Sequence, residues 1–259
     1  MRLPALVLVC LVAAAIAAPA VTPYGPERID LARRREAPSA AHLFGTDELG
    51  RDVLTRVVYG ARVSLAVGLL SAAVAGVCGV AIGGVAGYVG GALDEVLMRV
   101  GDGMLAIPRL PLLMIAAVVL QPSVPLLIAL IGLAGWMETA RVVRAELRTL
   151  GGAGFVESAR AAGAGPVRML LRHLLPNAAQ AVAVSLTLAV ARGILLESAL
   201  SFFGVGVRPP AASWGNMLYQ AQTALATEPW LAITPGAFIL LTTVSVNLIG
   251  DRLASRPTV

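Results

Sequence analysis

Two ionisable residues, Arg192 and Glu197, lie inside a long apolar stretch of the sequence, residues 178–203. A charged group at that depth in a membrane is costly, so it normally faces a bundle interior or a water-filled path. A pore or gating role is therefore one hypothesis for both residues. Their separation of five positions does not put them on one helix face, so a direct ion pair is not expected. The alternative for Glu197 is a position near the outer helix end, bonded to backbone.

Residues suited to bond-making chemistry are scarce. All 20 basic residues are arginine, whereas a conventional P-loop needs a lysine for its phosphates. His42 and His173 lie in separate polar segments, and neither a G-x-S-x-G nor an H-E-x-x-H motif is present. We therefore expect no catalytic residues, no metal site and no cofactor bound by this chain.

Another candidate functional segment is the polar passage within residues 151–177. Its residue pattern predicts two short helices on a membrane surface. Glu157 falls near the start of the first helix, where the helix dipole favours a carboxylate. Gly163 ends that helix, and Pro166 suits the first position of the next. Such a helical pair at the mouth of a bundle is suited to binding by another molecule.

The second of these helices carries Arg168 and Arg172 on one face and reaches Pro176. Its opposite face is an apolar stripe with helical spacing, formed by Val167, Leu170, Leu171, Leu174 and Leu175. The stripe could bind a partner or pack under the chain's own spans. We favour partner binding for the first helix and support for the second.

The composition is that of a membrane protein: 58% of the residues are hydrophobic, 14% are charged, and the mean hydropathy is +0.82. The net charge of +5 does not indicate nucleic-acid binding, because the arginines are scattered between apolar runs. About 20 apolar residues cross a bilayer. Six stretches approach that length: 3–21, 65–89, 104–120, 124–143, 178–203 and 231–249.

Two of the six predicted spans are less regular than the others. The third contains Pro108 and Pro111, and the first could be a cleaved signal peptide, although we favour its retention. An even number of spans places both termini on one side of the membrane. A small excess of arginine on the side of Glu157 favours a cytoplasmic location for that loop and for both termini.

Small residues on the second span predict close helix packing, because Gly79, Gly83 and Gly87 fall four apart on one face. Before that span, residues 22–41 are expected to be irregular and extracytoplasmic. An amphipathic helix lying at the interface should follow, started by Thr46 or Asp47, with its acidic residues in caps and salt bridges.

Between the last two spans, residues 204–230 are long enough to fold back into the outer mouth of a pore. Trp214 and Trp230 are typical of the aromatic belt at a membrane interface. We expect structural anchoring here rather than contact with a solute.

Several of these motifs resemble those of one family, the binding-protein-dependent ABC importer permeases. Glu157-Ser158-Ala159, then Gly163, then Leu175-Pro176 is similar to the family's Glu-Ala-Ala signature, with Ser158 at a position that usually holds alanine. Further segments resemble the C-type permease subunits of the dipeptide, oligopeptide and nickel group. These segments are GTDELGRD at 45–52, YGARVSL at 59–65, LSFFG at 200–204, PP at 209–210, SWGNML at 213–218, PW at 229–230 and NLIGD at 247–251.

The resemblance implies a type I ABC importer permease bundle of about six transmembrane helices in a bacterial inner membrane. It implies a heterodimer with a second permease subunit, two ABC ATPase subunits that carry ATP and Mg, and an extracytoplasmic solute-binding protein. Glu157, Ser158, Ala159 and Gly163 would form the ATPase-docking coupling helix, and Pro166, Arg168, Arg172 and Pro176 would support it. Arg192 stands where the group usually has a small residue.

The resulting division of the chain has four parts: a first transmembrane helix at 1–22, an extracytoplasmic segment at 23–63, a permease domain at 64–251 with a coupling loop at 146–177, and a cytoplasmic tail at 252–259. The implied activity is ATP-driven import of di- or oligopeptides or of a small solute such as a nickel chelate. An ion-gradient-driven secondary transporter is the alternative, and the one acidic residue that supports it is Glu197 within a predicted span. A membrane-embedded enzyme lacks a catalytic constellation.

Overall fold

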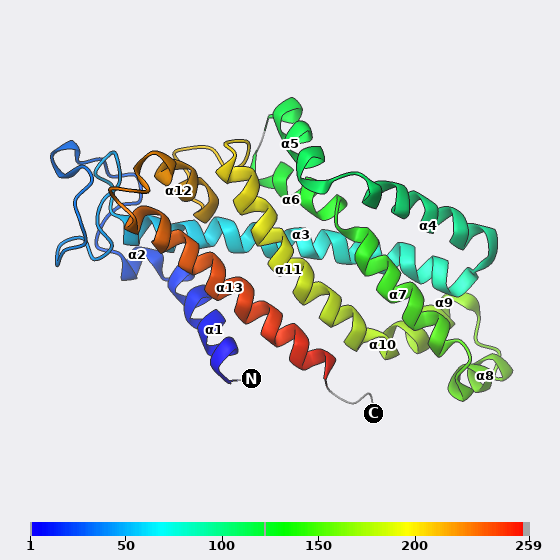
Figure 1. The fold of residues 1–259 in the computed structure, drawn as a ribbon. Helices are drawn as coiled ribbons and strands as arrows, with labels where there is room; N and C mark the ends of the chain where they lie inside the picture. Colours follow the sequence, from blue (N-terminus) through cyan, green and yellow to red (C-terminus); the bar gives the residue numbers. More distant parts are fainter. Residues whose placement is uncertain (1, 122, 256–259) are drawn as a thin grey trace.

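The computed structural model describes residues 2–121 and 123–255, and in that part the chain is built from helices that run alongside one another (Figure 1). The predicted all-α membrane bundle is confirmed. Its irregular segments include an isolated β-bridge between Thr46 and Asp52. Of the predicted tail at 252–259, the last four residues lie outside the described residues, as does Met1 of the first segment.

Helix α3, Val53–Val89, is the central element of the bundle (Figure 1). Its 37 residues span about 55 Å, well beyond the ~30 Å of a bilayer's hydrocarbon core. The predicted surface helix before the second span is wrong as a separate element, because nothing breaks the helix between them. Its supposed polar face is also buried, with Thr55 and Arg56 almost completely inaccessible. Asp52 caps α3 by accepting a hydrogen bond from the Thr55 N–H at 2.7 Å.

Among the described residues, four helical runs are long and apolar enough to cross a membrane: α3, Val124–Leu150, α11 at Ala179–Phe202 and α13 at Trp230–Ala254. The second run consists of α6, Val124–Leu133, and α7, Trp136–Leu150. These runs correspond to four of the six predicted spans. The first predicted span forms the shorter helices α1, Arg2–Ile16, and α2, Ala18–Val21, which pack on α3 and α13.

The predicted third span is a bent pair of helices rather than one straight helix. Helix α4, Gly91–Ala106, meets α5, Arg109–Leu120, at an angle of 83°. The bend falls at Ile107 and Pro108, because proline lacks an N–H and biases the preceding residue towards an extended conformation; Ile107 has φ −84° and ψ 128°. Counting this pair as one span gives five candidate spans in the described part of the chain.

The glycine face of α3 lies against α7, which confirms the predicted close packing. A Cβ on Gly83 would be 2.8 Å from the Ala140 Cα, and one on Gly87 would be 3.0 Å from the Arg144 Cα. A Cβ on Gly79 would be 2.7 Å from the Trp136 carbonyl oxygen. The backbones of α3 and α7 therefore approach so closely that no side chain fits between them.

One end of the bundle is a polar cap, which we define as residues 22–52 together with α12, Trp214–Ala221 (left in Figure 1). It contains the short 3₁₀ turn η1, Leu31–Arg33, and a second such turn, η3, Gln222–Ala224, directly follows α12. A predicted salt bridge is present between Asp47 and Arg51 at 2.7 Å, and Asp52 Oδ1 is hydrogen-bonded to His42 Nδ1 at 2.9 Å. These acidic side chains are buried and stabilise the cap.

The interfacial position predicted for Trp214 is wrong. Its side chain is fully buried, packs against Phe238, and donates a hydrogen bond from Nε1 to the Val57 carbonyl at 3.0 Å. The expected structural anchoring of this segment is nevertheless present. Ser213 and Asn216 form a capping box that starts α12.

Candidate functional site

The coupling segment, residues 151–177, lies at the end of the bundle opposite the polar cap (Figure 1). The first predicted helix is confirmed as α8, Gly154–Ala161, with Glu157 in its first turn. The second begins at Pro166 as predicted and continues as α9, Pro166–Arg168, a π-helical stretch η2, Met169–Leu174, and α10, Leu175–Asn177. The segment therefore leads into α11 with a change of helix type rather than a loop.

Helix α8 ends in a Schellman motif centred on Gly163. The Gly163 N–H donates to the Arg160 carbonyl at 2.9 Å, and the Ala164 N–H donates to the Ala159 carbonyl at 3.0 Å. This motif needs a residue in the left-handed conformation at the first position past the cap, and Gly163 has φ +80°. The predicted stop at Gly163 thus has a conformational cause, because other residues rarely adopt that φ.

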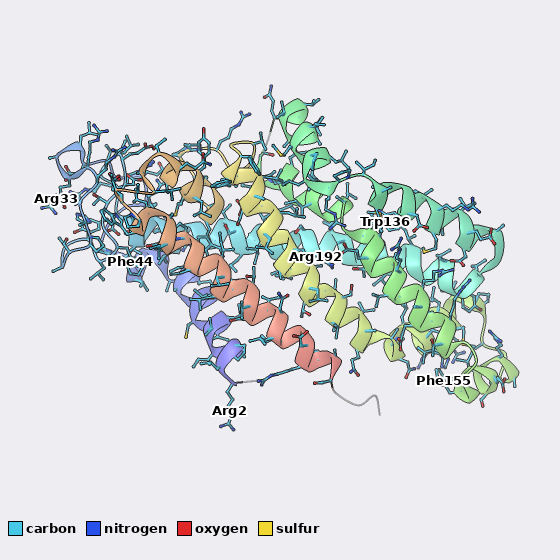
Figure 2. The ribbon with its side chains drawn as sticks, viewed as in Figure 1. Arg2, Arg33, Phe44, Trp136, Phe155 and Arg192 are labelled. Atoms are coloured by element: carbon cyan, nitrogen blue, oxygen red, sulfur yellow. The ribbon has the colours of Figure 1, made fainter. Side chains whose placement is uncertain are left out.

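A single buried residue, Val156, anchors α8 to the bundle. It belongs to an apolar cluster whose other buried members are Val143, Leu147, Met169, Leu174 and Ala178. The outward side of α8 carries Glu157, Ser158 and Arg160, while Ala159 is half-buried. Phe155, an aromatic residue beside them, has 39% of its surface exposed at this end of the molecule (Figure 2). The exposed face therefore combines charge with an apolar contact that our sequence reasoning did not single out.

The apolar stripe predicted for the second helix is only partly correct. Val167 and Leu171 are 71% and 60% exposed, whereas Met169 and Leu174 are buried. The cause is the π-helical stretch, which has i→i+5 hydrogen bonds and moves the buried positions from a spacing of three or four to one of five. Pro176 directly follows this stretch, and its missing N–H cannot complete a regular α-helical bond.

The supporting residues predicted on this helix are all solvent-exposed: Pro166, Arg168, Arg172 and Pro176. On the bundle side, α4 and α7 also support this segment. Asp94 of α4 is buried and forms ion pairs with Arg144 and Arg148 of α7. This clamp fixes the end of α7 from which the coupling segment departs.

A second charged group lies within the bundle and includes Arg192. Glu138, in the first turn of α7, accepts a hydrogen bond from Arg109 Nη2 at 2.9 Å and forms an ion pair with Arg192 Nη1 at 2.5 Å. We call these three residues the charge cluster. Figure 2 shows Arg192 midway along the bundle. Arg109, which lies within the predicted third span, thus has a charged partner inside the bundle.

A cavity of about 390 Å³ opens beside the charge cluster between α7 and α11. Glu138 and Arg192 line one part of it, and Glu146 lines another. Its volume is within the range of small-molecule sites, roughly 300–1,000 Å³. Arg192 thus has the cavity exposure that a pore-lining role requires.

Glu197 is in a different environment, and its burial argues against the predicted pore-lining role. Its side chain is fully buried and accepts hydrogen bonds from Ser64 Oγ at 3.0 Å and Ser201 Oγ at 2.8 Å. Ser64 Oγ also accepts a bond from the Trp214 N–H at 3.1 Å. The Glu197 carboxyl group therefore ties α3 and α11 to the polar cap. Its partners are side chains rather than the backbone that we considered.

Among residues 2–121 and 123–255, no three His, Cys, Asp or Glu side chains gather in a way that could hold a metal ion. The features that the structure does present are a continuous axial helix, an exposed coupling segment and a charged cavity between spans. These features define the chain as a multi-span helical membrane protein.

Residues 79–259 match the family described as binding-protein-dependent transport system inner membrane component, and the chain belongs to this family. It is thus a multi-pass inner-membrane permease subunit of a binding-protein-dependent ABC transporter and has no catalytic role of its own.

Several curated relatives share nearly the whole chain. It is 38% identical over 252 residues to a putative peptide transport system permease protein of Brucella suis biovar 1 (strain 1330), covering 97% of this chain and 85% of that protein. For Bacillus subtilis (strain 168), identity is 36% to the oligopeptide permease OppC, with 96% and 81% covered. Identity is 38% to the dipeptide permease DppC of the same organism, with 95% and 78% covered.

The fold is also that of a solved transporter subunit. A chain of the MetNI methionine ABC transporter, in an inward-facing conformation, superimposes with a TM-score of 0.60 at 20% sequence identity. The match covers 77% of this chain and 95% of that chain. This likeness concerns the fold alone.

Proposed function

We propose that this chain is a permease subunit that moves di- or oligopeptides, or a related small solute such as a nickel chelate, into the cell. The exposed α8, fixed by Val156 beneath it and by the Schellman motif at Gly163, is the observation that carries the ATP-driven mechanism. The similarity to peptide, oligopeptide and dipeptide permeases of Brucella and Bacillus supports peptides as the solute.

Helix α8 is the proposed docking element for an ATPase subunit, through Glu157, Ser158, Ala159 and Gly163, with Phe155 as an added apolar contact. The polar cap is the proposed seat of the extracytoplasmic solute-binding protein. A second, related permease completes a heterodimer, and two ATPase subunits bind ATP and Mg. Residues 166–177 support the docked helix.

We further propose that the coupling segment and both chain termini are cytoplasmic. This orientation places the polar cap outside, together with the buried salt bridges that stabilise it. Helix α1 is proposed to remain as the first transmembrane helix. Arg62 of α3 supports this, because its Nη2 donates to the Ile16 carbonyl at 2.8 Å and satisfies the end of α1. The division of the chain at residues 22, 63 and 251 is retained as part of the proposal.

Transport then needs no bond chemistry in this chain. Closure of the ATPase dimer moves the docked α8, and the spans rock as rigid bodies between outward- and inward-facing states. The Asp94 clamp and the apolar cluster under Val156 transmit the movement, since they connect α8 to α7 and α4. Solute access to the central cavity changes as a result.

Purification of the tagged chain from membranes in mild detergent tests the docking role. We expect a P-loop ATPase and a second permease to copurify. Phe155→Ser should weaken ATPase retention, because it removes the apolar contact on α8. Phe203→Ser is the matched control, since Phe203 is also exposed but lies at the far end of α11. Equal ATPase retention by both variants would contradict the assignment of Phe155.

The source of energy separates the proposal from a secondary transporter. Peptide uptake into proteoliposomes that contain the assembled transporter should require ATP and should survive an uncoupler of the proton gradient. Uptake that continues without ATP and disappears with the uncoupler would overturn the ATP-driven mechanism. Stimulation of ATP hydrolysis by the solute-loaded binding protein provides an independent measurement.

A further inference from the structure

We propose that the cavity between α7 and α11 is a transit site for a peptide, in which Arg192 binds the carboxylate of the passing solute. This inference rests on the proposed function, since it concerns the solute of the same permease. It assigns a selectivity step to the transmembrane subunit itself, in addition to any selection by a binding protein.

The position of Arg192 is the first argument. It lies about 20 Å along α11, whose length is about 36 Å at 1.5 Å per residue, and is therefore close to the middle of the span. Charge at this depth is expensive and is normally retained for a pathway or a ligand. The Arg192 side chain is 39% exposed and lines the cavity.

The arrangement of charge around the cavity is the second argument. On α7, Glu138, Val142 and Glu146 are four residues apart and line the cavity as one face. On α11, Ser185, Leu188 and Arg192 are three and four residues apart and also line the cavity. The cavity therefore has a guanidinium group in one region, a carboxylate in another, and largely apolar walls between them, which is the complement of a zwitterionic chain.

The spacing fits a short peptide. Glu138, next to Arg192, is separated from Glu146 by about 12 Å along α7. An extended tripeptide spans about 10–11 Å at 3.3–3.6 Å per residue. Its carboxylate can reach Arg192 while its ammonium group approaches Glu146, and its side chains lie against Val142 and Leu188.

The charge cluster allows a solute carboxylate to exchange with Glu138 on Arg192. Glu138 Oε2 contacts Arg192 as an ion pair but makes no hydrogen bond in the described structure, whereas Oε1 accepts one from Arg109. A solute carboxylate can therefore replace Glu138 on Arg192 while Arg109 still neutralises Glu138. Glu138 thus acts as an internal substitute for the solute when the cavity is empty.

Reconstituted uptake of two probes tests the proposal: trialanine, and trialanine with an amidated C-terminus. The assembled transporter is compared as wild type and as Arg192→Gln, with the same binding protein. Any preference of the binding protein for one probe is then the same in both measurements and cancels when their acid-to-amide uptake ratios are compared. We expect Arg192→Gln to lower the acid-to-amide uptake ratio by about tenfold, the value of one charge-assisted hydrogen bond. Arg141→Gln is the matched control, because Arg141 is an exposed arginine of α7 paired with Asp102.

The outcomes separate the two proposals. An acid-to-amide ratio that is the same in wild type and Arg192→Gln overturns the carboxylate site and leaves the transport function standing. A wild type that hydrolyses ATP but imports neither probe overturns both the peptide assignment and this inference. Should Arg192→Gln fail to assemble, Arg192→Lys retains the charge without the planar fork. Arg192→Lys should lower the acid-to-amide uptake ratio by a few fold relative to wild type. An unchanged ratio would count against the carboxylate site.

Discussion

Replacing Gly163 by valine is the most direct perturbation of the coupling segment. A Cβ built on Gly163 would meet nothing within 4 Å, so the substitution introduces no steric overlap with neighbours. The cost comes from the backbone, because φ is +80° and an L-residue in a left-handed conformation costs roughly 1–2 kcal/mol. Each 1.4 kcal/mol is about a tenfold change in an equilibrium. The equilibrium between the capped and frayed end of α8 should therefore shift by about 5- to 30-fold.

Gly165→Val is the matched control for this change. Gly165 lies two residues away, is equally free of neighbours, and has φ −70° and ψ 165°, which valine adopts readily. Both variants should insert in equal amounts, measured by immunoblot of membranes. ATP-driven uptake per inserted molecule should fall by several-fold or more for Gly163→Val and remain near the wild-type value for Gly165→Val.

Equal uptake by the two variants would refute the reasoning, since it would mean that the Schellman end of α8 has no part in coupling. A loss of inserted protein confined to Gly163→Val would instead point to a folding role. Retention of the ATPase during purification distinguishes lost docking from a later defect in transmission. The prediction concerns docking, so ATPase retention should fall together with uptake.

Three other changes test the packing that supports both sites. Gly83→Ala places a methyl group 2.8 Å from the Ala140 Cα, and the overpacking should lower the melting temperature of the detergent-purified complex by roughly 2–10 °C. Gly84→Ala is the control, because its methyl group has room, and it should change the melting temperature by less than about 2 °C. Equal shifts for the two variants would contradict the close packing of α3 on α7. Glu197→Ala leaves two buried serine hydroxyls without their acceptor, so limited proteolysis of the polar cap should accelerate by about tenfold. Glu197→Gln keeps an acceptor oxygen and should change the digestion rate less. Equal digestion rates for the two variants would contradict the role of Glu197 in holding the polar cap to α3 and α11. Asp94→Asn removes the charge between two arginines of α7 and should lower the melting temperature by about 4 °C or more, with a smaller loss at high salt; an unchanged melting temperature would show that the clamp contributes nothing.

The features predictable from the sequence are those that depend on local residue types. The positive φ of Gly163, the start of a helix at Pro166 and the glycine face of α3 each follow from one residue or one spacing. The resemblance in motifs added the family and the coupling role. These inferences needed no knowledge of which helices become neighbours.

The charge cluster could not be assembled in that way. Glu138 and Arg109 fall within two different predicted spans, 124–143 and 104–120, and only the packing of α5, α7 and α11 brings them to Arg192. A usable signal existed, because an acid near the middle of a predicted span requires a partner. The apolar stripe failed for another reason: it assumed 3.6 residues per turn, while η2 is wider.

The unbroken α3 has a mechanical consequence. A helix that lacks an internal hinge behaves as a lever, so both of its ends must turn together. With a length of about 55 Å, a tilt of about 5° displaces one end relative to the other by about 5 Å. That displacement is sideways, perpendicular to the helix axis. A small rotation at one membrane face is therefore sufficient to change which side chains α3 contacts at the other.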